Sequence, residues 1–219
     1  MAFTDSNSKR IIELIQGIES RKEHSNAAPT YKDVSALQEI DKIVNEQLSN
    51  EETYDVDTVL DSIFAVRYLA NSYELMWRIV YAVKYYNTLI KLHFDLHSRF
   101  GKKEDERSDD YYCALRARNY YNPDKCADLI ELAKEFLSEN KRNKIEKEVL
   151  EDYHPLKHDP VELTDEYLAV IDEIEKAMDT EEVKKLHSFQ RNDLFQEMLR
   201  KRGIEWRSIT EMNPNMLFD

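Results

Sequence analysis

The sequence predicts an all-α protein, and two observations carry that prediction. Glycine and proline are scarce, with 3 Gly and 5 Pro in 219 residues, and residues 30–100 contain neither. These two residues form most tight turns, so the chain has little material for hairpins or for phosphate-binding loops. Apolar residues also recur at steps of three and four, which is the helical period. We therefore expect a single all-helical domain over residues 1–219, built from seven or eight helices.

The first two predicted helices are amphipathic. Ser8 is placed to cap the first helix, whose apolar residues form one face before the chain reaches Pro29. Asp33 is expected to open the second helix, which continues to about Leu48 with apolar residues on one side. Both helices should lie on the outside of the bundle.

The segment over about residues 57–100 differs because its apolar residues point in nearly every direction. A helix that is apolar all round is buried, so this segment should form the centre of the bundle. As one rod it would span roughly 66 Å at 1.5 Å per residue, more than a compact domain of this size needs. We therefore expect a break near Asn71 and Ser72, with Ser72 capping the second piece.

The charged run from Lys102 to Asp110 is predicted to be an exposed loop. A short helix with Arg116 and Arg118 should follow and stop at Asn122, where Pro123 is suited to begin the next helix. The highly charged residues 139–152 should continue that helix with little to bury.

The last third of the chain should contain two more helices and an apolar tail. Thr164 and Thr180 precede acidic residues and are predicted helix caps, and Gly203 should end the second of these helices. The tail, residues 204–219, is too apolar for a free end, and its large side chains are Trp206, Met212, Met216, Leu217 and Phe218. We expect it to dock on its own bundle or to join subunits of a homo-oligomer.

Composition limits the partners. With 44 acidic and 31 basic residues the formal net charge is −13, which disfavours direct binding of nucleic acid, because that affinity comes from Lys and Arg on phosphates. It favours a protein partner with a basic surface. Cys113 and Cys126 lack the CxxC spacing of metal or redox sites. With no apolar run of membrane-spanning length, we expect a cytoplasmic protein that does not enter membranes.

His93 and His97 are the strongest metal candidates that the pattern offers. They are one helical turn apart, so both could reach the same ion. The sequence shows no third and fourth ligand that would complete the site, so we expect no metal and no cofactor. A metal-dependent hydrolase remains the alternative.

No catalytic motif appears elsewhere. The chain has no glycine-flanked serine of the hydrolase type and too few glycines for a phosphate loop. We therefore do not assign catalytic residues, and the balance is against an enzyme.

The best binding candidates are arginines and aromatic side chains. Arg116 and Arg118 lie among tyrosines, and exposed Tyr beside Arg is typical of binding hot spots. The predicted binding residues are Arg116, Arg118, Tyr112, Tyr120, Trp206 and Phe218. The alternative for the tyrosines is packing in the core with the hydroxyl at the surface.

A long apolar helix, a charged loop, a helix with Arg118-Asn119 and a further helix from Pro123 follow one another over about residues 57–140. This order is similar to the HEPN family of helical ribonucleases and nucleotide-binding proteins. That family places a His four to six residues after the Arg-Asn, whereas Asp124, Lys125 and their neighbours include no His. The resemblance implies a divergent form without the catalytic His, and RNA cleavage or nucleotide binding remains an alternative.

Taken together, charge, missing motifs and the aromatic tail favour a non-enzymatic, protein-binding or inhibitory module. One form of this hypothesis is a nucleic-acid mimic that occupies a basic site on its partner.

Overall fold

The computed structural model describes residues 6–22, 28–49, 55–101, 107–121, 126–152 and 156–216. Within these ranges the chain is helical and contains no β-strand, so the predicted all-α class is confirmed. Eleven α-helices lie in the same ranges, more than the seven or eight expected. The difference includes helices of only four residues, which are too short to show a periodic pattern in the sequence.

The chain divides into two compact units, Met1–Tyr153 (unit 1) and His154–Asp219 (unit 2). Each unit has a hydrophobic core of its own. The single domain expected over residues 1–219 stays a prediction.

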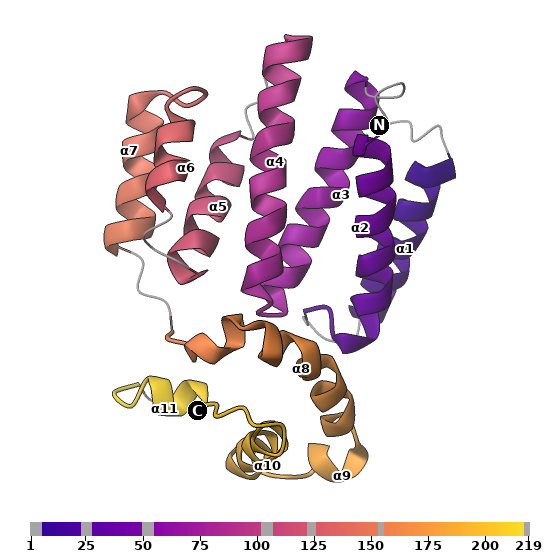
Figure 1. Cartoon of the computed structure of the whole chain (residues 1–219), viewed down its shortest axis with the longest axis vertical. Coiled ribbons are helices and arrows are strands. Elements are labelled where there is room, and N and C mark those ends of the chain that lie inside the picture. The colour runs from indigo at the N-terminus through magenta and orange to yellow at the C-terminus, as the bar shows by residue number, and fades with distance from the viewer. Residues whose placement is uncertain are drawn as a thin grey trace. The chain divides into compact units, whose positions relative to one another are not determined.

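Unit 1 is a series of helices in which neighbours in the sequence pack side by side (Figure 1). Its α-helices are α1 (Ser6–Lys22), α2 (Val34–Ser49), α3 (Val56–Leu75), α4 (Ile79–Phe100), α5 (Arg107–Tyr121), α6 (Cys126–Ala133) and α7 (Glu139–Lys147). A 3-10 turn, η1 (Tyr31–Asp33), precedes α2, and a π-helical turn, η4 (Glu148–Asp152), follows α7.

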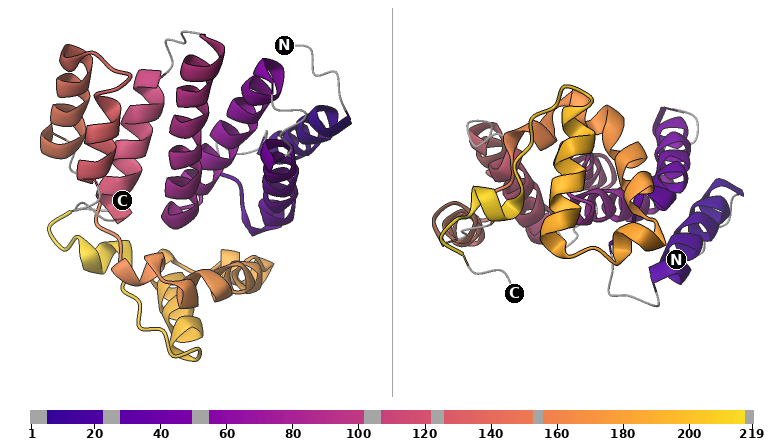
Figure 2. Two further views of the ribbon diagram at one scale, coloured as in Figure 1. Left: turned by 45° about the horizontal axis from the view of Figure 1, so that its top comes forward. Right: turned by 90° about the horizontal axis from the view of Figure 1, so that it is seen from below.

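The centre of unit 1 is the antiparallel pair α3 and α4 (Figure 2). The predicted burial of this segment is confirmed, but the break lies at Met76–Arg78 and not at Asn71 and Ser72. Ser72 and Tyr73 are buried inside α3, and Tyr73 stacks on Tyr85 of α4 at a centroid distance of 5.5 Å. The reversal occurs at Trp77, whose φ of 56° is left-handed.

The starts of α1 and α2 also differ from the predictions. Ser8 does not cap α1, because it lies inside the helix, fully buried, and its hydroxyl donates to Asp61 of α3 at 2.8 Å. Asp33 is the last residue of η1 and lies just before α2. Its carboxylate accepts from the backbone N–H of Thr30, so the two residues form a reciprocal capping box.

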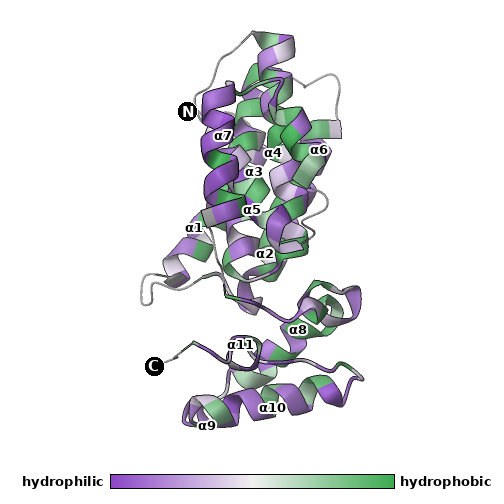
Figure 3. Ribbon diagram, turned by 90° about the vertical axis from the view of Figure 1, so that its left-hand side faces the viewer, coloured by the Kyte–Doolittle hydropathy of each residue, from purple (hydrophilic) through white to green (hydrophobic). Residues whose placement is uncertain are grey.

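The predicted loop over Lys102 to Asp110 is wrong at its end. Residues 102–106 lie outside the described residues, but α5 already begins at Arg107 and Asp110 is buried. The predicted helix start at Asn122 and Pro123 also lies outside them. The charged segment from residue 139 does not continue the preceding helix as predicted, because α6 ends at Ala133 and a separate helix, α7, begins at Glu139. The residues of α7 are hydrophilic along most of its length (Figure 3).

Unit 2 contains a 3-10 turn, η5 (Pro160–Leu163), and the helices α8 (Asp165–Met178), α9 (Glu181–Lys184), α10 (Ser188–Arg200) and α11 (Ile209–Met212). Thr164 and Thr180 cap helices as predicted, each hydroxyl accepting a backbone N–H at 3.3 Å. The single helix expected from Thr180 to Gly203 is wrong, because Thr180 caps only α9 and a separate helix, α10, begins at Ser188. Gly203 has a φ of 79°, a left-handed conformation that suits the turn after α10. No helix in the described part of the chain is long and apolar enough to cross a membrane.

Candidate binding groove in unit 2

A groove with a volume of about 370 Å³ opens between the end of α8, α9, α10 and the tail. Such a volume is within the usual range of ligand pockets. The lining combines large apolar residues with polar and basic ones: Met178, Val183, Lys184, Ser188, Arg191, Asn192, Phe195 and Trp206. Trp206 is one of the predicted binding residues, and it brings the tail into this site.

The aromatic residues of the groove are held in place by contacts within unit 2. Trp206 packs edge-on against Phe195 with ring centroids 4.8 Å apart. Its indole N–H donates to Oε1 of Glu162 at 2.6 Å, and Oε2 of the same carboxylate lies 2.9 Å from Nδ1 of His158. Glu162 is only 4% exposed. The orientation of the Trp206 indole is therefore fixed by a buried partner and does not depend on a ligand.

The tail is fastened to unit 2 on both sides of Trp206. Ile204 is buried in the same core as Leu199. Both the backbone N–H and Nε of Arg207 donate to Oδ2 of Asp159 at 2.9 Å. Burial alone would raise the pKa of Asp159, but the hydrogen bonds from Arg207 and Val161 outweigh it and lower that pKa. The carboxylate therefore stays charged and keeps the tail in position at neutral pH.

The basic side chains of the groove are of two kinds. Nζ of Lys184 lies 2.8 Å from Asp179 and 3.2 Å from Glu181, so its charge is already compensated. Arg191 is exposed and forms no ion pair within the described ranges. It lies on the same face of α10 as Ser188, Asn192 and Phe195, since these positions are separated by three, four and seven residues. Arg191 is therefore the cation available to a ligand in this groove.

The other predicted tail residue cannot be placed, because Phe218 lies outside the described residues. Met216, also named in the apolar tail, is 55% exposed. Of the apolar side chains that the structure describes in the tail, Trp206 is therefore the one that both packs on unit 2 and lines a groove.

Arg116 of α5 is occupied by a structural ion pair in unit 1. Its Nε and Nη2 both reach Oε1 of Glu74, at 2.8 and 2.5 Å, and the Tyr86 hydroxyl donates to the other oxygen. Burial alone would lower the pKa of Arg116, but Glu74 outweighs it and the net shift is upward. This arginine ties α5 to α3, and its predicted role in binding a partner stays a prediction.

The remaining α5 candidates also make internal contacts. Arg118 donates to Oδ1 of Asn87 at 2.8 Å, and Tyr120 packs edge-on against Trp77 at 4.9 Å. Tyr112 is half-buried, and the Arg116 guanidinium lies 5.5 Å from the centre of its ring. The structure thus does not bring these residues together with Trp206 within one unit.

The two histidines have different surroundings. His93 is 3% exposed, and its Nε2 lies 2.5 Å from Oδ2 of Asp110, whereas His97 is exposed. Arg67 pairs with the same Asp110 oxygen at 3.0 Å. Within the described ranges, no group of three or more His, Cys, Asp or Glu residues is arranged to hold a metal ion. His93 instead joins α4 to α5 through Asp110.

Searches of protein-family models, curated proteins and solved structures give no match for this chain. Trp206 was predicted from the sequence, whereas Phe195, Arg191 and Asn192 were not. Phe195 reads as a core residue of an amphipathic helix, and the two polar residues read as a solvated face. Their spacing on α10 is the only signal that could have grouped them.

Proposed function

We propose that this protein is a non-enzymatic protein-binding module, and that the unit 2 groove receives a large apolar side chain from its partner. The observation that supports this most is the fixed aromatic pair of Trp206 and Phe195 at an open groove. Burying one large aliphatic or aromatic side chain is worth about 1.5–3 kcal/mol. Because Glu162 already orients the indole, little of that free energy is lost in ordering the site.

Local charge favours a carboxylate next to the apolar anchor. Arg191 is the cation of the groove that has no acidic partner within the described ranges. A carboxylate in the bound segment would form a charge-assisted hydrogen bond with it, and such bonds are stronger than neutral ones. The groove thus supports an apolar side chain with an acidic group close to it in the partner's sequence.

The net charge of the chain acts at longer range than the groove and favours a partner of opposite charge. A net charge of −13 attracts a protein with a basic surface and accelerates encounter, whereas single contacts decide how long the complex lasts. If the bound basic surface is the partner's active site or nucleic-acid-binding site, this protein acts as an inhibitor, and mimicry of a nucleic acid is one form of that role. A cytoplasmic location belongs to the same proposal and is supported by the two free thiols, Cys113 and Cys126.

Heptapeptides are suitable probes of the groove. Each carries one leucine, methionine or phenylalanine, one glutamate two positions later and lysines elsewhere, with both ends blocked. The chain has two tryptophans, so an ¹⁵N-labelled sample gives two indole N–H signals, which Trp206→Phe assigns. We expect at least one peptide to shift the Trp206 signal, with a dissociation constant of about 0.1–1 mM. Replacing its apolar anchor by alanine should abolish the shift.

The variant pair Arg191→Glu and Arg200→Glu separates local recognition from general charge attraction. Both arginines are exposed on α10, but Arg200 does not line the groove and lies beside Glu205. Arg191→Glu should weaken the peptide about tenfold, which corresponds to about 1.4 kcal/mol, and Arg200→Glu should change it little. Equal losses in both variants, or no shift of the Trp206 signal with any peptide, would refute the groove as the binding site.

A further inference from the structure

Unit 1 has a second hollow that is independent of the unit 2 groove. It lies between α5 and α7 and has a volume of about 400 Å³. Its lining is mostly polar: Ser108, Asp109, Tyr112, Lys141, Lys144, Ile145 and Glu148. Tyr112 is a predicted binding residue, while the two lysines come from a helix in which the sequence indicated no site.

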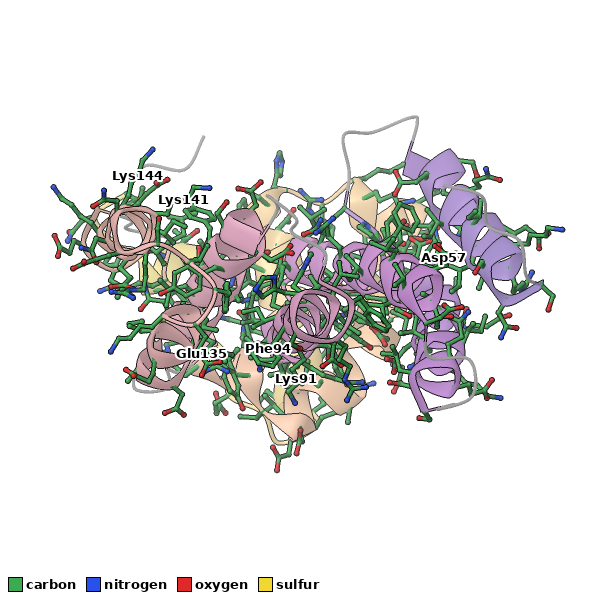
Figure 4. All side chains as sticks on the ribbon, turned by 90° about the horizontal axis from the view of Figure 1, so that it is seen from above. Asp57, Lys91, Phe94, Glu135, Lys141 and Lys144 are labelled. Atoms are coloured by element: carbon green, nitrogen blue, oxygen red, sulfur yellow. The ribbon has the colours of Figure 1, made fainter. Side chains whose placement is uncertain are left out.

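The lysines are placed to receive an anion. Lys141 and Lys144 are one turn apart on α7, both are exposed, and their side chains lie on the same side of that helix (Figure 4). Neither forms an ion pair with any acidic side chain in the described ranges, although the chain has more acids than bases. Arg142, between them, is paired with Glu146 at 3.1 Å. Two ammonium groups that form no ion pair within the described ranges can both approach one dianion at this concave surface.

The ring of Tyr112 gives the hollow a rigid apolar wall. The Arg116 guanidinium lies 5.5 Å from the ring centre, a cation–π contact, and Glu74 holds that guanidinium. The ring is therefore oriented from inside unit 1. Ile145, which precedes α7's end by two residues, adds an aliphatic surface in the same hollow.

The two carboxylates in the lining restrict the ligand further. Asp109 and Glu148 are exposed and have no ion-pair partner in the described part of the chain. They repel ligands with several separate acidic groups, and they accept hydrogen bonds from hydroxyl or amino groups. The suitable ligand is thus small and aromatic, with its negative charge concentrated at one end.

We propose that this hollow binds a small aromatic phosphomonoester. The phosphate lies between Lys141 and Lys144, and the aromatic body lies against Tyr112 and Ile145. Hydroxyl or amino groups on that body donate to Asp109 and Glu148. This site is separate from the proposed peptide groove, so either proposal can fail while the other holds.

Phenyl phosphate, inorganic phosphate and phenol test the parts of this proposal with the full chain at pH 7.5. We expect phenyl phosphate to shift the backbone amide signals of residues 108–112 and 141–148, and to bind at least about tenfold more tightly than either fragment. Tyr112→Leu should weaken phenyl phosphate but leave inorganic phosphate unchanged. Equal affinities for phenyl phosphate and inorganic phosphate would overturn the aromatic part.

Lysine variants test the phosphate part. Lys144→Gln should weaken phenyl phosphate about five- to tenfold, because one charge-assisted hydrogen bond is lost. Lys147→Gln is the matched control, since it removes the same charge from the same exposed helix but does not line the hollow. Equal effects of the two variants would overturn the site. A phosphotyrosine pentapeptide that binds more tightly than phenyl phosphate would overturn the small-molecule assignment in favour of a phosphorylated protein.

Discussion

Asp110 is the residue in unit 1 whose loss should have the clearest effect on stability. Its carboxylate joins three helices, with Arg67 of α3 at 3.0 Å and His93 of α4 at 2.5 Å. Asp110→Asn keeps the shape of the side chain but removes the charge. The side chains of Asp110 and His93 are 6% and 3% exposed, whereas that of Arg67 is 31% exposed.

The size of the effect follows from this burial. Removing one partner of a fully buried pair costs about 3–5 kcal/mol, and water reaches Arg67, so we expect about 2–4 kcal/mol at pH 7. In a chain of this length that lowers the melting temperature by roughly 5–15 °C. Asp109→Asn is the control, because Asp109 is exposed and should cost less than about 1 kcal/mol.

The pH dependence gives a second, independent check. Burial alone would raise the pKa of Asp110, but the hydrogen bonds from His93 and Arg67 outweigh it, so the pKa in the folded state is lowered. A lowered pKa stabilises the fold above the unfolded value of about 3.9, and this stabilisation is lost as the pH falls through the folded value. The free energy of unfolding in urea should thus differ less between the original protein and Asp110→Asn at pH 3 than at pH 5. A loss below about 1 kcal/mol, or a difference that grows as the pH falls through this range, would refute the reasoning.

Two further predictions concern the other clusters. Arg116→Ala should lower the free energy of unfolding in urea by about 2–3 kcal/mol, because it leaves the half-buried carboxylate of Glu74 without its cation. A loss below about 1 kcal/mol would contradict this. Truncation after Gly203 removes Ile204 and Trp206 from unit 2 and should lower its calorimetric transition by more than about 10 °C; an unchanged transition would show that the tail does not stabilise the unit.

The helical class and the central buried segment could be predicted because they depend on local composition and period. The position of the break could not. Ser72 looks like a helix cap, but packing buries it inside α3, and the reversal falls on Trp77, which no propensity scale would select for a left-handed conformation. Local signals of this kind yield to tertiary contacts.

The site residues show the same limit. Asp110 belongs to a charged run that reads as a loop, and its burial depends on Arg67 and His93, which are distant in sequence. Trp206 could be identified, because a large aromatic side chain in an apolar tail needs a partner surface. Arg191 could not, since an exposed arginine on a polar helix face looks the same with or without a groove beside it.

The short reversal at Trp77 favours a particular order of folding for the helices of unit 1. Helices α3 and α4 share the most extensive contact of any helix pair in the described ranges, and only residues 76–78 separate them. Closing so short a loop loses little chain entropy, and contacts between sequence neighbours form quickly. Helices α2 and α5 each adjoin this hairpin in the chain and pack against it. Unit 1 can thus grow outward from the α3–α4 hairpin by adding one adjacent helix at a time.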